Sequence, residues 1–261
     1  MEVIKEMNYK DSFDFKGKIV LVTGGGGGIG KELAHAFSKC DGTIVVADIL
    51  QNKAKEAAEE LRDADGTAEW ITTDISSLES IKNMISYTVE KFGKLDILLN
   101  NAGLNIRKPA IEFTETDWEK IISVNLKGAF FVAQESGKQM IKQQKGKIIN
   151  IASDGAFLAT ANLAIYQTSK AGVAHFTKVL AKEWAPYHIN VNAIGPGYVI
   201  TEMTKKFLED QKIHDELLKK IPLGRFATPK DVASVALFLA SPLADYITGQ
   251  TIFVEGGRLL Y

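Results

Sequence analysis

Tyr166 and Lys170 stand four residues apart in the helical pattern of residues 165–183. Residues at this spacing share a helix face, so the phenol and the ammonium can meet. A free phenol, with a pKa of about 10, is a poor base at neutral pH, but a nearby positive charge favours the phenolate. Ser153 follows a predicted strand and can hold a substrate oxygen by a hydrogen bond. Together these residues could take the proton of an alcohol while a hydride leaves.

A run of glycines forms a second candidate site. Five consecutive glycines, Gly24–Gly28, and then Gly30 follow the apolar stretch Lys18–Thr23 and precede a helical pattern. Backbone N–H groups in such a turn can reach a phosphate at the start of a helix. The run fits both the G-x-G-x-x-G and the T-G-x-x-x-G-x-G patterns of dinucleotide sites, so its register stays open. A P-loop is excluded, because Glu32 occupies the position of the Ser or Thr that would bind Mg²⁺.

Asp48 lies 20 residues after Gly28, at the end of the predicted strand Thr43–Asp48. A carboxylate at this point can accept hydrogen bonds from both hydroxyls of an adenosine ribose. The 2′-phosphate of NADP would instead face it as a like charge, at a cost of several kcal/mol at about 4 Å. Residues 49–51 supply no compensating cation. The sequence therefore predicts NAD as the cofactor.

Alternating strand and helix patterns must position these residues. Seven short apolar stretches are predicted as strands: Lys18–Thr23, Thr43–Asp48, Ala68–Thr73, Leu95–Asn100, Gly146–Ile151, Ile189–Ile194 and Thr251–Val254. Most are too apolar on both faces for a sheet with one face in water. Helix-start patterns lie between them, at Ser76–Glu79, Thr114–Asp117 and Thr228–Asp231. The sequence predicts an α/β fold, a Rossmann-type doubly wound parallel sheet of about seven strands with helices on both faces.

Residues 1–261 are predicted to form a single dinucleotide-binding and catalytic domain, because no linker interrupts the alternation of strands and helices. Residues 1–15 form a polar leader. The highly charged stretch 201–222 is either a solvated helix or a mobile lid over the substrate.

Composition and charge exclude several classes of protein. The chain is 46% hydrophobic and carries 31 basic and 32 acidic side chains, for a net charge of -1. This balance gives no electrostatic footprint for nucleic acid or an anionic membrane. No apolar run is long enough to span a bilayer, Cys40 has no partner for an intrachain disulfide, and the charged residues 1–18 do not resemble a secretion signal. We expect a cytoplasmic protein. The four histidines show no metal-ligand spacing, so no metal is expected.

Taken together, the motifs resemble those of the short-chain dehydrogenase/reductase family. They are, in order, Thr23-Gly24-x-x-x-Gly28-x-Gly30, Asn100-Asn101-Ala102-Gly103, Ser153, Tyr166-x-x-x-Lys170 and Pro196-Gly197. The resemblance implies that Asn125, Ser153, Tyr166 and Lys170 are catalytic. Asn125 would fix a water beside the lysine in a proton relay, and a helix-surface amide is the alternative for this residue.

The resemblance also implies a cofactor site, in which Asp74 and Ile75 contact the adenine and Val199 and Thr201 bind the nicotinamide carboxamide. The full set of expected cofactor residues is Gly24, Gly28, Ile29, Gly30, Asp48, Asp74, Ile75, Asn101, Ala102, Gly103, Tyr166, Lys170, Pro196, Gly197, Val199 and Thr201.

The substrate is indicated less strongly than the reaction. Residues 104–109, 196–204 and 221–225 are similar to the sugar-acid branch of the family, the gluconate 5-dehydrogenases and 2-deoxy-D-gluconate 3-dehydrogenases. A sugar acid or sugar is therefore expected. Arg107 either offers a guanidinium fork to a substrate carboxylate or is a surface arginine. Asp154 either accepts substrate hydroxyls or is a loop carboxylate exposed to water.

Two other functions stay open. A 3-oxoacyl carrier-protein reductase shares the same motifs, but it would favour NADPH and a basic surface for an acidic carrier. A non-catalytic sensor could bind NAD and signal to a partner, although such a protein has no need of a tuned phenol.

The resemblance implies a homotetramer. The helical stretches 114–143 and 165–183 carry apolar residues beyond the needs of one sheet face, which is typical of a subunit interface. The alternative is that these residues fill the core. They are Phe130, Phe131, Val173, Phe176, Val179 and Leu180. Relatives in the family are commonly tetramers.

Overall fold

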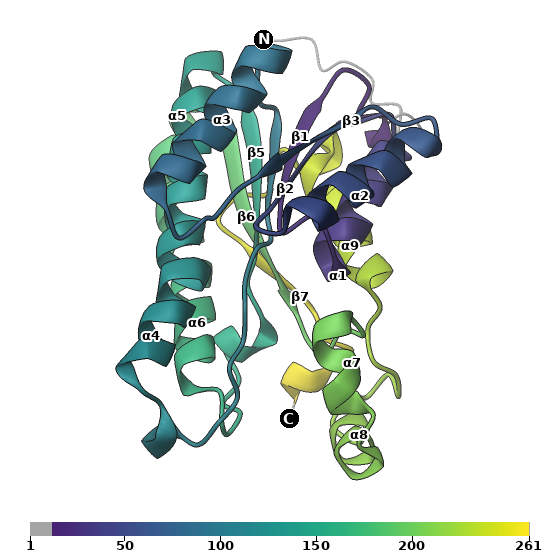
Figure 1. Cartoon of the computed structure of the whole chain (residues 1–261), viewed down its shortest axis with the longest axis vertical. Coiled ribbons are helices and arrows are strands. Elements are labelled where there is room, and N and C mark those ends of the chain that lie inside the picture. Colours follow the sequence, from purple (N-terminus) through teal and green to yellow (C-terminus); the bar gives the residue numbers. More distant parts are fainter. Residues whose placement is uncertain (1–11, 261) are drawn as a thin grey trace.

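The computed structural model describes residues 12–260, apart from the side chains of residues 206 and 207. Most of the predicted leader therefore lies outside the described residues. One seven-stranded sheet runs through the molecule, with every strand parallel to its neighbours and in the order β3-β2-β1-β4-β5-β6-β7 (Figure 1). The strands are β1 Ile19–Thr23, β2 Thr43–Asp48, β3 Ala68–Thr72, β4 Ile97–Asn100, β5 Gly146–Ile151, β6 Ile189–Pro196 and β7 Thr251–Val254. This confirms the predicted doubly wound fold.

Helices cover both faces of the sheet. Figure 1 shows α3, α5 and α6 on one side and α1, α2 and α9 on the other. The helices are α1 Gly28–Ser38, α2 Gln51–Asp63, α3 Leu78–Phe92, α4 Glu115–Ile122, α5 Ala129–Gln143, α6 Ala164–Trp184, α7 Glu202–Leu208, α8 Gln211–Leu218 and α9 Pro229–Ala240. Each parallel crossover needs such a helix to bring the chain back to the same edge.

The core has two layers because side chains alternate along each strand. In β1, Val20 and Val22 pack into the layer under α1, α2 and α9, whereas Ile19 and Leu21 pack into the layer under α3, α5 and α6. All of them are buried. A strand buried on both faces explains why the sequence shows an unbroken apolar run instead of an alternating one.

The predicted strand ends are right for β2, β5 and β7 and differ by up to two residues elsewhere. The largest differences are at β4, which begins at Ile97, and at β6, which continues to Pro196. Before β4, the Leu95 N–H donates to Gln143 Oε1, and Asp96 Oδ2 accepts from the Ile19 N–H. Asp96 also donates its backbone N–H to the Ile19 carbonyl oxygen and accepts from the Lys147 N–H, so pairing with β1 and β5 already begins one residue before Ile97.

Helix starts follow the predicted chemistry at two of three places. Thr114 with Asp117 and Thr228 with Asp231 form reciprocal capping boxes at the starts of α4 and α9. The prediction for Ser76–Glu79 is wrong by one residue, because Ser77 is the N-cap of α3 and its hydroxyl accepts from the Ser80 N–H. Ser76 instead donates its N–H and its hydroxyl to Asp74.

The predicted helix over 114–143 is interrupted. Between α4 and α5, residues Ser123–Gly128 form a turn of π-helix. The turn places Asn125 on the inner side, with none of its surface exposed. Such turns shift the side chains that follow and are frequent at functional sites.

The charged stretch 201–222 forms two short helices, α7 and α8, where the sequence predicted one solvated helix or a lid. Leu217, Ile221 and Phe226 pack together in a small buried cluster at its end. Most of the other side chains of α8 are exposed or half-buried, as expected of a solvated helix. The lid remains a prediction.

The apolar surplus on α5 and α6 divides into two groups. Val173 and Leu180 fill the core, so an interface role for them is wrong. Phe130, Phe131 and Phe176 are half-buried and stack edge to face, with ring centroids 5.5 and 5.8 Å apart. Val179 is 43% exposed.

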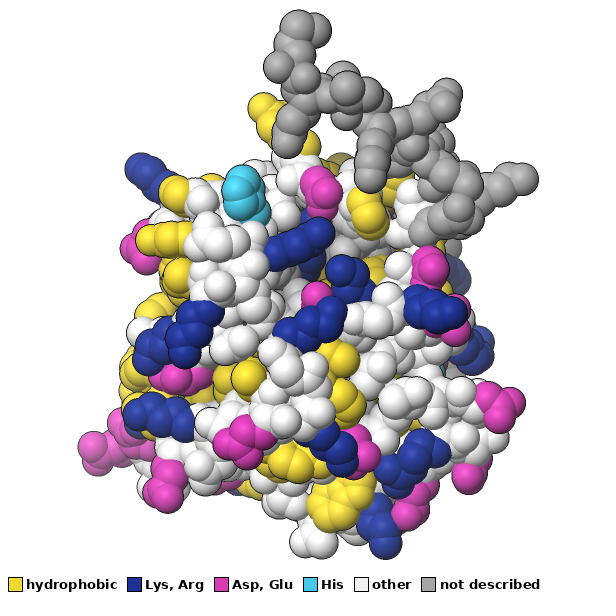
Figure 2. Space-filling view, turned by 90° about the horizontal axis from the view of Figure 1, so that it is seen from above, with side chains coloured by type: hydrophobic (Ala, Val, Ile, Leu, Met, Phe, Trp, Pro, Cys, Tyr) yellow, Lys and Arg dark blue, Asp and Glu magenta, His cyan; other side chains and the backbone are white. Residues whose placement is uncertain are grey.

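No helix within residues 12–260 is both long and apolar enough to cross a membrane. Figure 2 shows Lys and Arg side chains interspersed with Asp and Glu side chains over the face seen from above. This mixture matches the near-zero net charge of the sequence.

Candidate active site

A cleft of about 480 Å³ opens at the carboxyl ends of the central strands. β1 and β4 are neighbours in the sheet, while the chain runs from β1 to β2 on the other side. A crevice forms where the order reverses in this way, and ligands of open α/β sheets bind there. Sixteen of the predicted site residues line it: Gly24, Gly28, Ile29, Asp48, Asp74, Ile75, Asn101, Ala102, Gly103, Ser153, Tyr166, Lys170, Pro196, Gly197, Val199 and Thr201.

The backbone fixes the register of the glycine turn. Gly24 and Gly28 have φ angles of 61° and 53°, in the left-handed region that favours glycine. A Cβ on Gly30 would lie 2.1 Å from the Gly24 carbonyl oxygen, so Gly30 is required although it does not line the cleft. The turn therefore uses the T-G-x-x-x-G-x-G register, which the sequence left open.

The start of α1 is suited to hold a phosphate. The N-cap is Gly27, which has no side chain to cap the helix, and a Cβ there would meet nothing within 4 Å. The first N–H groups of a helix have no partner within the helix, and they carry the positive end of its dipole. They face the cleft through Gly28 and Ile29. This end of the cleft fits the pyrophosphate of a dinucleotide.

Asp48 is held at the end of β2 by two backbone groups. Its Oδ2 accepts from the Gly26 N–H and its Oδ1 from the Leu50 N–H, both at 3.0 Å. The carboxylate is half-buried and lines the cleft beside the glycine turn. Its free lone pairs fit the hydroxyls of an adenosine ribose.

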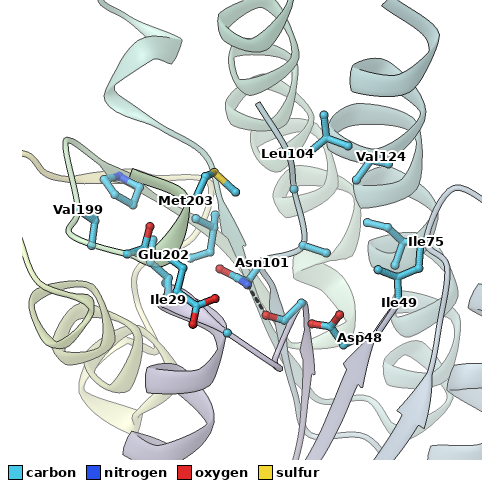
Figure 3. A pocket seen from close by; sticks show the side chains of 18 of the residues that line it. Ile29, Asp48, Ile49, Ile75, Asn101, Leu104, Val124, Val199, Glu202 and Met203 are labelled. Carbon is cyan, nitrogen blue, oxygen red and sulfur yellow. Dashed lines mark hydrogen bonds between the residues drawn. The ribbon is translucent and has the colours of Figure 1, made fainter. Parts of the chain in front are cut away.

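Asn101 joins the glycine turn to the middle of the cleft. Its Nδ2 donates to the carbonyl oxygens of Thr23 and Gly24, at 3.0 and 3.2 Å. Figure 3 shows Asn101 near the centre of the cleft, with Glu202 and Met203 on one side and Ile75 and Leu104 on the other. This segment therefore both supports the turn and lines the cleft.

Ser153, Tyr166 and Lys170 meet at the other end of the cleft. Ser153 follows β5 and is 7% exposed. Lys170 donates from Nζ to the Ile151 carbonyl oxygen at 2.7 Å, and Nζ lies 5.9 Å from the centroid of the Tyr166 ring. The helix α6 thus brings the phenol and the ammonium to one face, as their spacing predicts.

The predicted lowering of the Tyr166 pKa by Lys170 is not seen in the protein alone. Burial raises the pKa of the phenol to about 12, although the ring still borders the open cleft. A hydrogen bond with Ser153 opposes this rise, and the negative charge of Asp154 adds to it. Burial also lowers the pKa of Lys170 to about 8, which weakens its positive charge at alkaline pH. Desolvation is the largest cause of both shifts.

Asn125 lies behind the reaction end of the cleft and does not line it. Its amide exchanges two hydrogen bonds of 2.8 Å with the backbone of Leu104 and donates to Ser169 at 3.2 Å. A Cβ on Gly103 would lie 3.3 Å from Asn125 Oδ1 and 3.4 Å from Lys170 Nζ, so the two side chains are neighbours. The surface-amide alternative is wrong, because Asn125 is fully buried.

The two substrate residues suggested by the sequence lie outside the cleft. Arg107 is exposed and lines a separate cavity, together with Tyr198 and Arg258. Asp154 is 5% exposed and forms an ion pair with Arg258. The reading of Asp154 as a water-exposed loop carboxylate is therefore wrong, since the folded chain buries it.

Comparison with known proteins supports the assignment that this geometry favours. A family model described as enoyl-(acyl carrier protein) reductase matches residues 24–258. A 2-dehydro-3-deoxy-D-gluconate 5-dehydrogenase of Dickeya dadantii is 40% identical over 95% of this chain and 98% of its own length. A 3-oxoacyl-[acyl-carrier-protein] reductase of Aquifex aeolicus is 41% identical over 93% of this chain and 97% of its own length. The chain belongs to the short-chain dehydrogenase/reductase family.

A solved member of this family has nearly the same fold. The crystal structure of a gluconate 5-dehydrogenase from Burkholderia cenocepacia, in complex with NADP and tartrate, matches with a TM-score of 0.94 at 36% identity. The match covers 97% of this chain and 100% of that one. This short-chain dehydrogenase/reductase is therefore an oxidoreductase acting on CH–OH groups, which excludes a non-catalytic sensor as its class.

Sequence reasoning missed two charged groups at the site of this short-chain dehydrogenase/reductase. Lys53 lines the cleft five residues after Asp48, just beyond residues 49–51, which supply no cation. Its Nζ lies 2.8 Å from Glu202 Oε2. A search one helical turn further would have found it. Arg258 lies near the end of the chain and gives no signal in the sequence.

Proposed function

We propose that this enzyme transfers a hydride between NAD and a secondary alcohol or ketone of a small polar substrate, a sugar acid or sugar. The observation that carries the proposal is that one cleft joins the uncapped start of α1, the carboxylate of Asp48 and the group Ser153–Tyr166–Lys170. The first two features fit the phosphates and ribose of a dinucleotide. The third fits acid–base chemistry at an alcohol.

The residues at the reaction end have separate tasks in this proposal. Ser153 holds the substrate oxygen by a hydrogen bond, and Tyr166 takes its proton when the alcohol is oxidised. Lys170, anchored on the Ile151 carbonyl oxygen, keeps a positive charge beside the phenol. A bound oxidised nicotinamide supplies the hydride acceptor and a further positive charge. The buried phenol needs such charges, because its pKa is about 12 in the protein alone.

NAD is proposed over NADP because of Asp48. Its carboxylate would repel a 2′-phosphate, and the one cation near it in the cleft lining, Lys53, is already paired with Glu202. The gluconate 5-dehydrogenase neighbour was solved with NADP, so the choice needs a direct test. Steady-state turnover with NAD⁺ and NADP⁺ should give a higher kcat/KM with NAD⁺. Equal values would contradict the proposal.

A sugar acid is proposed because of the cations beside the reaction end. A second cavity, of about 610 Å³, is lined by Arg107, Lys219 and Lys220 and by Arg258, which is paired with Asp154 outside the lining. No carboxylate is among its lining residues. A planar guanidinium suits a carboxylate, which it can bind through two hydrogen bonds. The Dickeya dadantii relative and the Burkholderia cenocepacia neighbour are both named for sugar acids.

A panel of sugar acids, free sugars and polyols, read by NADH formation, tests the substrate class. Arg107→Ala should raise the KM for sugar acids about tenfold and leave the KM for polyols unchanged, as expected for loss of a charged hydrogen bond. Arg225→Ala is a matched control. Arg225 binds Asp231 and lines neither the cleft nor the second cavity. An unchanged KM for every sugar acid would remove Arg107 from the site.

A carrier-protein thioester is the second candidate substrate, favoured by the Aquifex aeolicus relative. Reduction of a 3-oxoacyl thioester at a kcat/KM above that of every sugar acid would establish it instead. The near-neutral charge of the chain argues against an acidic carrier as partner.

We also propose a homotetramer that buries the half-exposed rings of Phe130, Phe131 and Phe176. These half-buried aromatic side chains form a stacked cluster on α5 and α6. Sedimentation at micromolar concentration should give four copies, and a monomer would contradict the proposal. Phe131→Glu should dissociate the assembly, because it would place a charge in an apolar contact.

A further inference from the structure

Arg258 and Asp154 form a buried ion pair behind the reaction end of the cleft. They are 104 residues apart in the sequence, and the side-chain exposures are 9% and 6%. Arg258 Nη1 donates to Asp154 Oδ2. Removing two charges from water costs about as much as the pair returns, so stability alone does not explain such a pair.

Arg258 is fixed on its other side as well. Its Nη2 donates to Thr160 Oγ1 at 3.1 Å, and the guanidinium carbon lies 4.5 Å from the centroid of the Tyr198 ring. Thr160 belongs to the loop that follows β5, and Tyr198 follows Gly197 at the cleft wall. The guanidinium is therefore held in one place and can act on Asp154 as a fixed charge.

Asp154 reaches the reaction end through Ser153. Its Oδ1 accepts from Ser153 Oγ at 3.2 Å, and the same Oγ accepts from the Gly155 N–H at 3.0 Å. A serine hydroxyl has one proton to donate. Asp154 thus competes with the Tyr166 oxygen, and with a substrate oxygen, for the proton of Ser153.

The charge of Asp154 also acts on Tyr166. It raises the pKa of the phenol, whereas Arg258 opposes the rise that burial causes in the pKa of Asp154. Lys170, on the same helix as Tyr166, also carries a charge near the ring, with Nζ 5.9 Å from the ring centroid. Loss of Arg258 would let burial raise the pKa of Asp154 further. At a pH where Asp154 is ionised, it would then be a stronger acceptor for Ser153 and a more effective negative charge beside Tyr166.

We propose that Arg258 and Asp154 are positioning residues of the reaction: Asp154 orients the hydroxyl of Ser153, and Arg258 neutralises Asp154 so that Ser153 and Tyr166 can act on the substrate oxygen. The inference rests on the dehydrogenase class of the enzyme, and it holds whichever alcohol is the substrate. The turn Arg258–Leu260 would then serve the reaction, because it holds Arg258 against Asp154.

Titration of Tyr166 tests the proposal without a substrate. The near-ultraviolet absorbance of the phenolate is followed against pH with saturating NAD⁺, and each protein is compared with the same protein carrying Tyr166→Phe. If NADP⁺ binds more tightly, it replaces NAD⁺. The difference isolates Tyr166 from the other tyrosines and cancels the absorbance of the cofactor. A failure of the sugar-acid proposal leaves this measurement unaffected.

The variants should move the titration in opposite directions. Arg258→Met should raise its midpoint by about one pH unit, because Asp154 is left uncompensated, and Asp154→Asn should lower it. The double variant should return close to wild type. Arg258→Lys should lie between wild type and Arg258→Met, because it keeps the charge and loses the fork. Arg225→Met, which breaks an exposed ion pair with Asp231, is the control and should not move the midpoint.

Equal midpoints in Arg258→Met and wild type, with native circular dichroism in both, would overturn the proposal. So would a double variant whose midpoint stays where Arg258→Met put it, since that result would indicate general damage to the site. Where Arg258→Met does not fold, Asp154→Asn decides alone: a lowered midpoint supports the proposal and an unchanged one overturns it.

Discussion

The two ends of the cleft are built in different ways. At the dinucleotide end the backbone sets the geometry, because Gly24 and Gly28 adopt positive φ angles and Gly30 has no room for a Cβ. At the reaction end, side chains from distant parts of the chain converge, as Ser153 and Arg258 do through Asp154. The first end is set mainly by the continuous segment from β1 to Asp48, with Asn101, which follows β4, supporting the turn. The second depends on charges that only the folded chain brings together.

This difference separates what substitutions at each end should do. A change at the dinucleotide end acts on backbone packing, and so on folding and cofactor binding. A change at the reaction end acts on proton positions, and so on turnover with the fold kept.

After Tyr166→Phe, the largest effect is expected for Ser153→Ala. Loss of the hydroxyl removes one donor to the substrate oxygen, which should lower kcat about 10²–10³-fold. The affinity for NAD⁺, measured by equilibrium binding, should stay within a factor of two or so, because Ser153 acts at the other end of the cleft. Ser234→Ala, at an exposed position of α9, is the control and should change neither quantity. A parallel loss of NAD⁺ affinity would show that the two ends are coupled.

Gly30→Ala should act on the fold instead. The added Cβ would lie 2.1 Å from the Gly24 carbonyl oxygen, so the turn or α1 must shift. We expect the free energy of unfolding of the cofactor-free protein to fall by about 1–3 kcal/mol in urea titrations. Gly27→Ala is the matched control, since its Cβ would meet nothing within 4 Å. Equal stability of the two variants would mean that the backbone does not set this end of the cleft.

Asp48→Asn should change the choice of cofactor. The neutral amide removes the repulsion of a 2′-phosphate and one acceptor for the ribose hydroxyls. The ratio of kcat/KM for NAD⁺ over NADP⁺ should fall about tenfold, as expected for about 1.4 kcal/mol. Glu32→Gln, a neutralisation on α1 outside the cleft lining, is the control. An unchanged ratio would show that Asp48 does not read the ribose.

The smallest effect is expected for Glu202→Gln. The pair Lys53–Glu202 is exposed and joins α2 to the start of α7 beside the glycine turn. Freeing Lys53 should lower the KM for NADP⁺ about two- to fivefold at low salt, and the gain should vanish at high salt. Glu59→Gln breaks an exposed pair with Lys55 on the same helix and should have no such effect. A change that persists at high salt would point to a structural cause.

The dinucleotide end could be predicted from the sequence because its constraints are local. A strand, a glycine turn, a helix and an acid 20 residues on are all visible in the order of residues. The ends of β2, β5 and β7 also follow from short apolar runs bounded by polar residues. The register of the glycine run could not be chosen, since consecutive glycines look alike until φ angles and contacts separate them.

The reaction end could be predicted only in part. The pair Tyr166–Lys170 follows from helical spacing, but the balance of burial against charge at the phenol depends on how closely the fold surrounds it. The π-helix that buries Asn125 gives no pattern in the sequence. The contact of Arg258 with Asp154 joins segments 104 residues apart, which no local period can reveal.

Tyr166→Phe tests the central claim most directly, when turnover and NAD⁺ binding are measured on the same preparation. The substitution removes the hydroxyl that takes the proton and leaves the glycine turn and Asp48 untouched. We expect kcat to fall by about 10²–10⁴-fold, while the Kd for NAD⁺ changes far less, because the other cofactor contacts remain. Turnover near the wild-type rate would contradict this expectation, because the phenol would then not be the acid–base group of this enzyme.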